Sequence, residues 1–157
     1  CLKRDYEFVF EMDADFSHDP KDLKRLYTVC KEDNIDLVIG SRYIQGVNVV
    51  NWPLSRVLLS YTASLYVRLI TGMKVLDPTA GFVCYRRVVL EAINLDQIKF
   101  IGYAFQIEMK YITYKNKFKI KEIPIIFTDR LFGDSKLSKG IISEAIFGVL
   151  QMRLKNF

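Results

Sequence analysis

The pattern of apolar and polar positions at the start of the chain predicts a strand, a helix and a second strand. Residues 6–12 form a short apolar run that is typical of a buried strand. Asp19 and Pro20 then supply an N-cap and a first helical position, and the apolar side chains that follow recur at helical spacing. Residues 35–39 form the next apolar run, so we expect a β-α-β unit over residues 6–39 with parallel strands and a right-handed crossover.

Residues 53–70 predict a long amphipathic helix. Its apolar positions are Leu54, Val57, Leu58, Tyr61, Leu65 and Leu69. Arg56, Ser60 and Arg68 have spacings that place them together on another side. Two interpretations fit this pattern and can coexist: a helix that faces the core with solvated arginines, or a helix that lies on a membrane surface. Its uncharged run, residues 57–67, is well short of the roughly 20 apolar residues that a spanning helix needs.

The rest of the chain continues the alternation of strands and helices. The expected elements are a loop at 46–53, a turn at 77–82, a strand at 83–85, a helix at 87–93, a helix at 102–116, a strand at 118–127 and a helix at 141–154. Pro124 favours a sheet edge for the strand at 118–127, because proline has no backbone N–H to donate to a neighbouring strand. With no internal repeat, low-complexity tract or linker, the pattern predicts one α/β domain.

Composition narrows the class of protein and its partners. Half of the 157 residues are hydrophobic, which excludes a disordered chain. Lysine and arginine outnumber the acids by 23 to 18, and the net charge of +5 favours anionic partners such as phosphates or membrane surfaces. No zinc-finger spacing or recognition-helix pattern accompanies this charge, so a nucleic-acid partner is not indicated. The three scattered cysteines are typical of reduced thiols in the cytosol.

Two carboxylates, Asp13 and Asp15, directly follow the first predicted strand. Ligands of α/β proteins gather at the carboxyl ends of strands, and side chains two residues apart on an extended segment point the same way. Carboxylate oxygens suit Mg²⁺ or Mn²⁺ that holds phosphates. The alternative is a helix N-cap beside a solvated acid. Arg42 follows the second predicted strand and therefore reaches the same sheet edge, which favours a site.

Further polar side chains lie at the ends of later elements. Asp77 begins the turn at 77–82, where it could simply cap that turn. Gln106 and Glu108 lie in the first turns of the helix at 102–116, where the helix dipole alone would stabilise an acid.

The last polar cluster is a glycine-bearing loop after the strand at 118–127. Arg130 and Lys136 have the donors to clamp a diphosphate, and Ser135 adds a hydroxyl. A basic loop of this kind can also be no more than solvated surface.

Five stretches together resemble the family-2 glycosyltransferases of the GT-A fold, most closely the polyprenyl (dolichyl) phosphate mannosyltransferases. They are DADFSHDP from Asp13, GSRYIQG from Gly40, DPTAGF from Asp77, GYAFQIE from Gly102 and DRLFGDSKL from Asp129. Their order and spacing are similar to the family's and they cover nearly the whole chain. The resemblance implies an α/β fold of the GT-A (nucleotide-diphospho-sugar transferase) type, a Rossmann-like mixed sheet with flanking helices.

The resemblance implies roles for the residues at these positions. Asp13 and Asp15 would hold Mg²⁺ or Mn²⁺ against the phosphates of the nucleotide-sugar donor. Asp77, Gln106 and Glu108 would form the catalytic set, which orients the sugar or stabilises its developing charge. The acceptor phosphate would meet Arg42, Arg56 and Ser60. The donor diphosphate would be covered by Arg130, Ser135 and Lys136.

The implied activity is the inverting transfer of mannose from GDP-mannose to a polyprenyl (dolichyl) monophosphate. A phosphate oxygen is anionic at neutral pH, so no strong general base is needed. The implied setting is the cytoplasmic face of a membrane, with peripheral attachment. Two alternatives remain: transfer of glucose or another sugar to a bacterial polyprenyl phosphate or a glycan, and a non-catalytic module that binds membrane surfaces.

The sequence also departs from the family pattern. Ser17 stands where relatives often carry glutamine as a further ligand on the metal side. Nothing corresponds to the family's first strands, which hold the nucleotide, so residues 1–157 would be the N-terminally truncated, C-terminal portion of a single GT-A domain, inactive by itself. Membrane helices found in some relatives are not matched either. A sheet without its first strands exposes edges, which predicts self-association.

Overall fold

A mixed four-stranded sheet organises the computed structural model, which describes residues 1–129 and 139–154, with the side chains of 139–144 excepted. The strands, in the spatial order β1-β4-β2-β5, are β1 (Phe8–Glu11), β4 (Val83–Arg86), β2 (Leu37–Ser41) and β5 (Ile120–Pro124). A second, two-stranded sheet pairs β3 (Val49–Val50) with β6 (Phe127–Thr128) in parallel. The expected α/β class and the edge position of the strand that contains Pro124 are both confirmed.

The pairing of β4 differs from what the β-α-β pattern suggests. β4 lies between β1 and β2 and is antiparallel to both, so β1 and β2 run parallel, as expected, without being paired. All of β2 and most of β4 are buried, whereas β1 is only half-buried. The most apolar strands therefore occupy the middle of the sheet, and β1 forms one edge of it.

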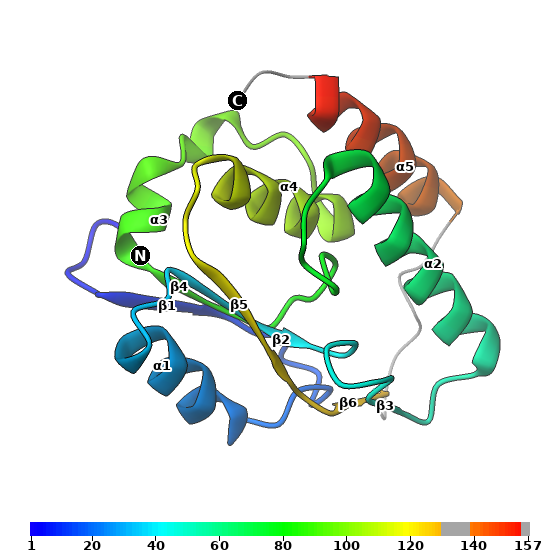
Figure 1. The fold of residues 1–157 in the computed structure, drawn as a ribbon, viewed down its shortest axis with the longest axis horizontal. Helices are drawn as coiled ribbons and strands as arrows, with labels where there is room; N and C mark the ends of the chain where they lie inside the picture. The colour runs from blue at the N-terminus through cyan, green and yellow to red at the C-terminus, as the bar shows by residue number, and fades with distance from the viewer. Residues whose placement is uncertain (130–138, 155–157) are drawn as a thin grey trace.

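Helices cover both faces of the sheet. They are α1 (Asp22–Glu32), α2 (Leu54–Thr71), α3 (Arg87–Ala92), α4 (Gly102–Lys115) and α5 (Lys139–Leu154), with a 3₁₀ turn at Leu95–Gln97. Figure 1 shows α1 on one face and α3 and α4 on the other, with α2 and α5 packed outside α4. Each helix expected from the sequence is present within a few residues of its expected bounds.

The alternation of side chains along the strands divides the core between the two faces. Leu37 and Ile39 of β2 pack toward α3 and α4, while Val38 between them packs toward α1 with Leu26. A third cluster joins the outer helices, and it includes Val67 of α2. The period-two pattern of the central strands thus places apolar side chains on both faces, as a sheet covered on both sides requires.

The apolar stripe of α2 faces outward, so its interpretation as a core-facing stripe is wrong. Leu54 is 71% exposed and Leu69 is 74% exposed. The buried positions of the helix are instead Ser64, Val67 and Thr71. These smaller side chains face the packed interior of the outer helices, and the bulkier leucines remain on the outside.

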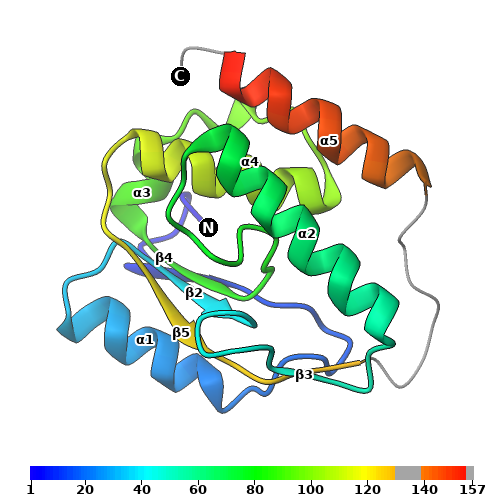
Figure 2. The ribbon, with the colours of Figure 1, turned by 45° about the vertical axis from the view of Figure 1, so that its right-hand side comes forward.

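The outward face of α2 continues onto α5. The two helices lie side by side in both views (Figures 1 and 2), and the Tyr66 hydroxyl donates a 3.0 Å hydrogen bond to the Ile146 carbonyl oxygen. We call their exposed apolar side chains the α2–α5 apolar set: Leu54, Leu58, Leu59, Tyr61, Leu65, Leu69, Ile146, Phe147, Leu150 and Leu154. No helix within residues 1–129 and 139–154 is long and apolar enough to cross a bilayer.

The contrast between buried and outward leucines can be tested with two matched variants. Leu26→Ala removes a side chain with no exposure from the α1 face of the core, so we expect a loss of about 2–5 kcal/mol in the free energy of unfolding. Leu69→Ala removes the same atoms from the exposed face, and its effect should stay within about 0.5 kcal/mol. Urea unfolding followed by circular dichroism measures both. Equal losses would contradict the outward placement of the stripe.

Candidate active site

The polar clusters of the sequence meet at the edge of the sheet where β1 and β2 end. Because β4 runs antiparallel to both, the residues that reach this edge are those before it, the turn at 77–82. The start of α4 lies at the same edge, since Gly102 and Tyr103 line a cavity with Asp13 and Asp15. Three connections and one helix start therefore converge on one place.

Two cavities adjoin at this edge. The carboxylate cavity, of about 600 Å³, contains Asp13, Asp15, Glu11 and Gln106. The α2–α4 cavity, of about 300 Å³, lies between α2, α4 and α5 and is mainly apolar. The residues that line both are Arg42, Trp52, Arg56, Thr79 and Tyr103. The two cavities thus share a wall that carries two guanidinium groups.

The Asp13–Asp15 turn leaves one carboxylate available to a ligand. Asp15 Oδ1 accepts a 3.1 Å hydrogen bond from the Ser17 backbone N–H, which closes a local turn. Within the described residues, no hydrogen bond or ion pair engages the Asp13 carboxylate. A Cβ at Gly81 would lie 3.6 Å from Asp13 Oδ2, so glycine keeps the space beside this carboxylate open.

His18, which sequence reasoning missed, holds this turn in place. The Asp13 backbone N–H donates to His18 Nδ1 at 3.4 Å. The imidazole packs against Phe82 and Phe127, with ring centroids 4.9 and 5.1 Å away. Burial lowers the pKa of His18, and a neutral ring keeps Nδ1 as an acceptor. That His18 is the only histidine in the chain was a signal available in the sequence.

The two aspartates fit a cation that is shared with phosphates better than a cation enclosed by protein. No group of three or more histidine, cysteine or acidic side chains forms a complete metal site in the described part of the chain. Mg²⁺ is commonly bound by one or two carboxylates together with substrate phosphates and water, and Asp13 and Asp15 match that mode. The Ser17 hydroxyl is buried without a partner among the described residues, and Ser17 does not line the carboxylate cavity.

Asp77 binds Arg42 and does not line either cavity. Arg42 donates from Nε to Asp77 Oδ2 at 2.7 Å, from Nη2 to Oδ1 at 2.6 Å, and from its backbone N–H to Oδ2 at 3.0 Å. Burial alone would raise the pKa of the Asp77 carboxyl, but Arg42 holds it below its usual value. The geometry makes Asp77 the anchor of Arg42, and the role in orienting the sugar or stabilising its charge that the resemblance implies stays a prediction.

Arg42 and Arg56 form a cationic wall with Trp52, a residue that sequence reasoning also missed. The Arg56 guanidinium lies 4.1 Å from the Trp52 ring centroid, and the Arg42 guanidinium lies 5.5 Å from it. Arg56 Nη1 donates to Asp129 at 2.7 Å, while its buried Nε has no partner in the described residues. Ser60 lies one helical turn after Arg56 and accepts a 2.7 Å hydrogen bond from the Tyr43 hydroxyl. The expected trio of Arg42, Arg56 and Ser60 is thus brought together.

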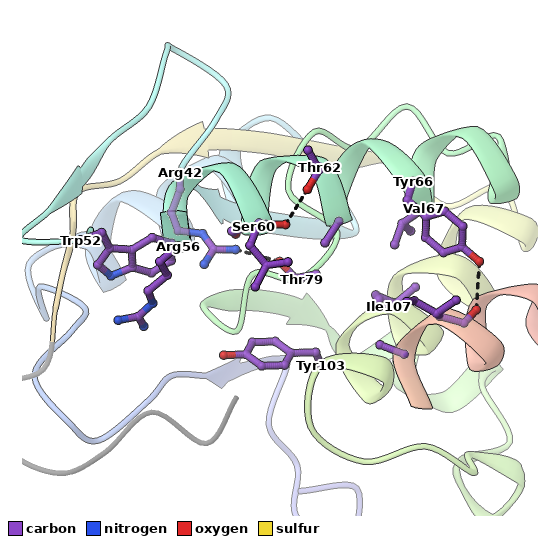
Figure 3. Close-up of a pocket in the computed structure, with 14 residues that line it drawn as sticks. Arg42, Trp52, Arg56, Ser60, Thr62, Tyr66, Val67, Thr79, Tyr103 and Ile107 are labelled. Atoms are coloured by element: carbon purple, nitrogen blue, oxygen red, sulfur yellow. Dashed lines mark hydrogen bonds between the residues drawn. The ribbon is translucent and has the colours of Figure 1, made fainter. Parts of the chain in front are cut away.

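The α2–α4 cavity has a cationic end and an apolar end. Figure 3 shows Arg42, Arg56 and Trp52 at one end, and Tyr66, Val67 and Ile107 at the other. Such a space can accept a molecule that carries a phosphate on an apolar chain, because each part meets a surface of its own kind.

Gln106 and Glu108 point to different places. Gln106 lines the carboxylate cavity. Glu108 has no exposure, and its Oε2 accepts hydrogen bonds from the backbone N–H groups of Lys99 and Phe100 at 3.0 and 3.2 Å. Residues two apart on a helix do not share a face, so the two side chains have different surroundings. Glu108 anchors the segment before α4, and the catalytic role that the resemblance implies for it stays a prediction.

Lys110 and Glu11 are two further buried or half-buried charges near the site that sequence reasoning missed. Lys110 donates to the Ala80 carbonyl oxygen at 2.6 Å and to Gln106 Oε1 at 3.0 Å. Burial lowers the pKa of Lys110 to about 8. The i, i+4 spacing of Gln106 and Lys110 was the available signal.

The expected diphosphate clamp lies outside the described residues. It consists of Arg130, Ser135 and Lys136.

Comparison with protein families and curated proteins identifies similar sequences. The model of the family described as "Glycosyl transferase family 2" matches residues 3–93. The chain is 44% identical over 153 residues to the undecaprenyl-phosphate mannosyltransferase of Micrococcus luteus, covering 98% of this chain and 62% of the relative. It is 44% identical over 154 residues to the polyprenol monophosphomannose synthase of Mycolicibacterium smegmatis, covering 98% and 58%. The chain thus spans about three fifths of these relatives' length.

Solved structures with a similar fold include glucosyl-3-phosphoglycerate synthase from Mycobacterium tuberculosis. Its complex with Mn²⁺, uridine diphosphate and phosphoglyceric acid superposes with a TM-score of 0.67 at 16% identity, over 99% of this chain and 51% of that one. Its complex with phosphoglyceric acid gives a TM-score of 0.65 at 18% identity, over 96% and 51%. At these identities the likeness establishes the fold and not the reaction.

The structural importance of the Arg42–Asp77 pair can be tested by unfolding. Asp77→Asn would leave the Arg42 charge buried without its counter-charge, so we expect a loss of about 3–5 kcal/mol in the free energy of unfolding. The matched control is Asp33→Asn, which disrupts an exposed pair with Lys121 and should cost less than about 1 kcal/mol. Chemical denaturation of both variants measures the difference. Equal small losses would show that Asp77 does not anchor Arg42.

Proposed function

The chain belongs to glycosyl transferase family 2, and we propose that the complete gene product transfers mannose from GDP-mannose to a polyprenyl (dolichyl) monophosphate with inversion at the anomeric carbon. The fold is of the GT-A type, as the sequence predicts. One observation carries the proposal: the acidic carboxylate cavity and the apolar α2–α4 cavity adjoin at a shared wall that contains Arg42 and Arg56. The names of the two relatives at 44% identity support mannose as the sugar and a polyprenyl phosphate as the acceptor.

The acceptor would occupy the α2–α4 cavity. Its phosphate would lie at the cationic end against Arg56, with Ser60 one turn further along α2. Its first isoprene units would lie at the apolar end between Val67 and Ile107. A phosphate oxygen is already anionic at neutral pH, so it can attack the anomeric carbon without a general base. The proposed reaction therefore needs no proton acceptor from Asp77 or Glu108, neither of which lines a cavity.

The donor would occupy the carboxylate cavity. Asp13 and Asp15 would hold the diphosphate through a divalent cation, and Arg42 would add positive charge from the shared wall. A bound Mg²⁺ or Mn²⁺ supplies neutralisation of the negative charge that develops on the leaving diphosphate. The buried ion pair with Asp77 keeps the Arg42 guanidinium in one orientation, so its charge is preorganised toward the junction of the two cavities. Arg130, Ser135 and Lys136 remain proposed as the diphosphate clamp.

The α2–α5 apolar set would place the protein on a membrane, peripherally and on its cytoplasmic face. Leu59 and Ile146 belong to this exposed set and also line the α2–α4 cavity. A prenyl chain could therefore pass from the hydrocarbon of a bilayer into the cavity along a continuous apolar route. The net charge of +5 favours anionic lipid head groups.

The metal assignment can be tested by activity. Asp13→Asn keeps the size of the side chain but removes the charge that would hold the cation, so we expect transfer of labelled mannose from GDP-mannose to a short polyprenyl phosphate to fall about 100-fold or more. Asp19→Asn, in the exposed turn before α1, where the expected N-cap at Asp19 is replaced by Lys21, is the control and should keep full activity. Chelation of divalent cations should abolish transfer by the unaltered protein. Full activity of Asp13→Asn, or of the chelated enzyme, would overturn the assignment.

Membrane contact can be tested by flotation with vesicles that contain anionic phospholipid. Leu69→Glu places a charge on the outward face of α2, and the lost burial of one leucine in lipid should reduce vesicle binding about tenfold or more. Val88→Glu makes the same change on α3 at a side chain that is 49% exposed and lies outside the α2–α5 apolar set. We expect that variant to bind like the unaltered protein. Equal binding of all three would exclude this face as the membrane surface.

A further inference from the structure

Lys110 is a fully buried lysine that the proposed chemistry does not use. Its ammonium donates to the Ala80 carbonyl oxygen at 2.6 Å, to Gln106 Oε1 at 3.0 Å and to the Gln106 carbonyl oxygen at 3.3 Å. An ammonium has three donors and no acceptor, so these three oxygens satisfy it completely. Burying a charge costs free energy unless the charge is paired and hydrogen-bonded. An apolar side chain would fill this position in the core without that cost.

The charged side chains around Lys110 come from four segments that are far apart along the chain. Asp77 in the turn before β4, Glu11 at the end of β1 and Glu122 on β5 carry negative charge toward it, and Arg42 after β2 carries positive charge. Burial lowers the pKa of Lys110 to about 8, and the three acids oppose that shift while Arg42 adds to it, so the ammonium form still predominates at pH 7. Lys110 therefore lies among the charged side chains of the site but does not line either cavity.

Lys110 decides the orientation of the Gln106 amide. Because an ammonium can only donate, the amide oxygen of Gln106 must face Lys110, and the amide nitrogen must then point the other way. In that direction it donates to Glu11 Oε1. Both Glu11 and Gln106 line the carboxylate cavity. The cavity is thus lined by the Glu11 carboxylate and the Gln106 amide, which are joined by a hydrogen bond. Lys110 holds the Gln106 amide from the side away from the cavity.

Glu11 has a defined relation to the proposed donor site. It lies two residues before Asp13 on the strand end, so the two residues are roughly 7 Å apart along the extended chain. That separation is about the length of a hexose ring. A sugar whose phosphate is held near Asp13 would therefore be within reach of the Glu11–Gln106 pair, because these residues line the same cavity.

We propose that the Glu11–Gln106 pair binds hydroxyl groups of the donor's hexose, with Glu11 accepting and Gln106 donating, and that Lys110 is the positioning residue that holds the pair in this orientation. The inference rests on the proposed function, because it assigns the sugar subsite of that same donor cavity. A carboxylate and an amide donor side by side match neighbouring hydroxyls, each of which can donate and accept. Glu11 would thereby contribute to the choice of sugar.

Steady-state kinetics of the complete gene product test the proposal. Lys110→Met keeps an unbranched side chain but removes the charge and the donors, so the Gln106 amide is free to turn. We expect kcat/KM for the nucleotide sugar to fall about 10- to 100-fold, the effect of losing a hydrogen bond to a charged group, while KM for the polyprenyl phosphate stays unchanged. Lys115→Met, in the last turn of the same helix and exposed, is the matched control and should behave like the unaltered enzyme.

Glu11→Gln provides a second variant that keeps the shape of a half-buried side chain, in case Lys110→Met does not fold. It should lower kcat/KM for the donor similarly and reduce discrimination between GDP-mannose and GDP-glucose. The double variant should be little worse than the worse single variant, because both act through Gln106. Unchanged donor kinetics in either folded variant, unchanged discrimination in Glu11→Gln, or strictly additive losses would overturn the proposal.

A readout that needs no activity separates this inference from the proposed function. The unfolding midpoints of Lys110→Met, Glu11→Gln and the double variant form a cycle whose non-additivity reports the coupling through Gln106. If the gene product transfers no sugar, the proposed function and the sugar subsite both fail, and a non-additive cycle would still support the positioning by Lys110. An additive cycle would overturn the positioning even in an active enzyme.

Discussion

The buried ion pair between Arg42 and Asp77 is the interaction on which the site depends. It ties the end of β2 to the turn before β4, and only the antiparallel direction of β4 brings that turn to the same sheet edge. The same turn carries Ala80, which accepts from Lys110, and Gly81, which leaves space beside Asp13. One buried pair therefore sets the position of the shared cationic wall and of the turn that borders both cavities.

Helix α4 distributes three polar side chains to three different tasks. Gln106 reaches the carboxylate cavity, Glu108 caps the backbone of the preceding segment, and Lys110 braces Gln106 from the interior. Gln106 and Lys110 are one turn apart and in contact, whereas Glu108, two residues from each, points to a different side of the helix. A single helix can in this way supply a ligand contact together with its support.

Helix α2 lines the α2–α4 cavity on one side and carries exposed apolar side chains on another. Arg56 and Ser60 face the α2–α4 cavity, whereas the leucines of the same helix face outward. Leu59 belongs to both surfaces. The helix is therefore suited to an acceptor that has an anionic head and an apolar chain, because the two halves of such a molecule are met on adjoining sides of one element.

The sequence by itself determined the helices and the four main strands, the turn that presents Asp13 and Asp15, and the placement of Arg42 at the same sheet edge, because periodicity and strand ends are local properties of the chain. It did not predict β3 in the expected loop at 46–53, nor the division of the expected strand at 118–127 into β5 and β6. Only the tertiary structure decided that the α2 stripe faces outward, that β4 separates β1 from β2, and that Asp77 and Glu108 face inward. The direction of a buried carboxylate depends on its counter-charge or donor, and for Asp77 that partner lies 35 residues away along the chain. Such pairings depend on tertiary packing, which the local pattern of apolar and polar residues does not specify.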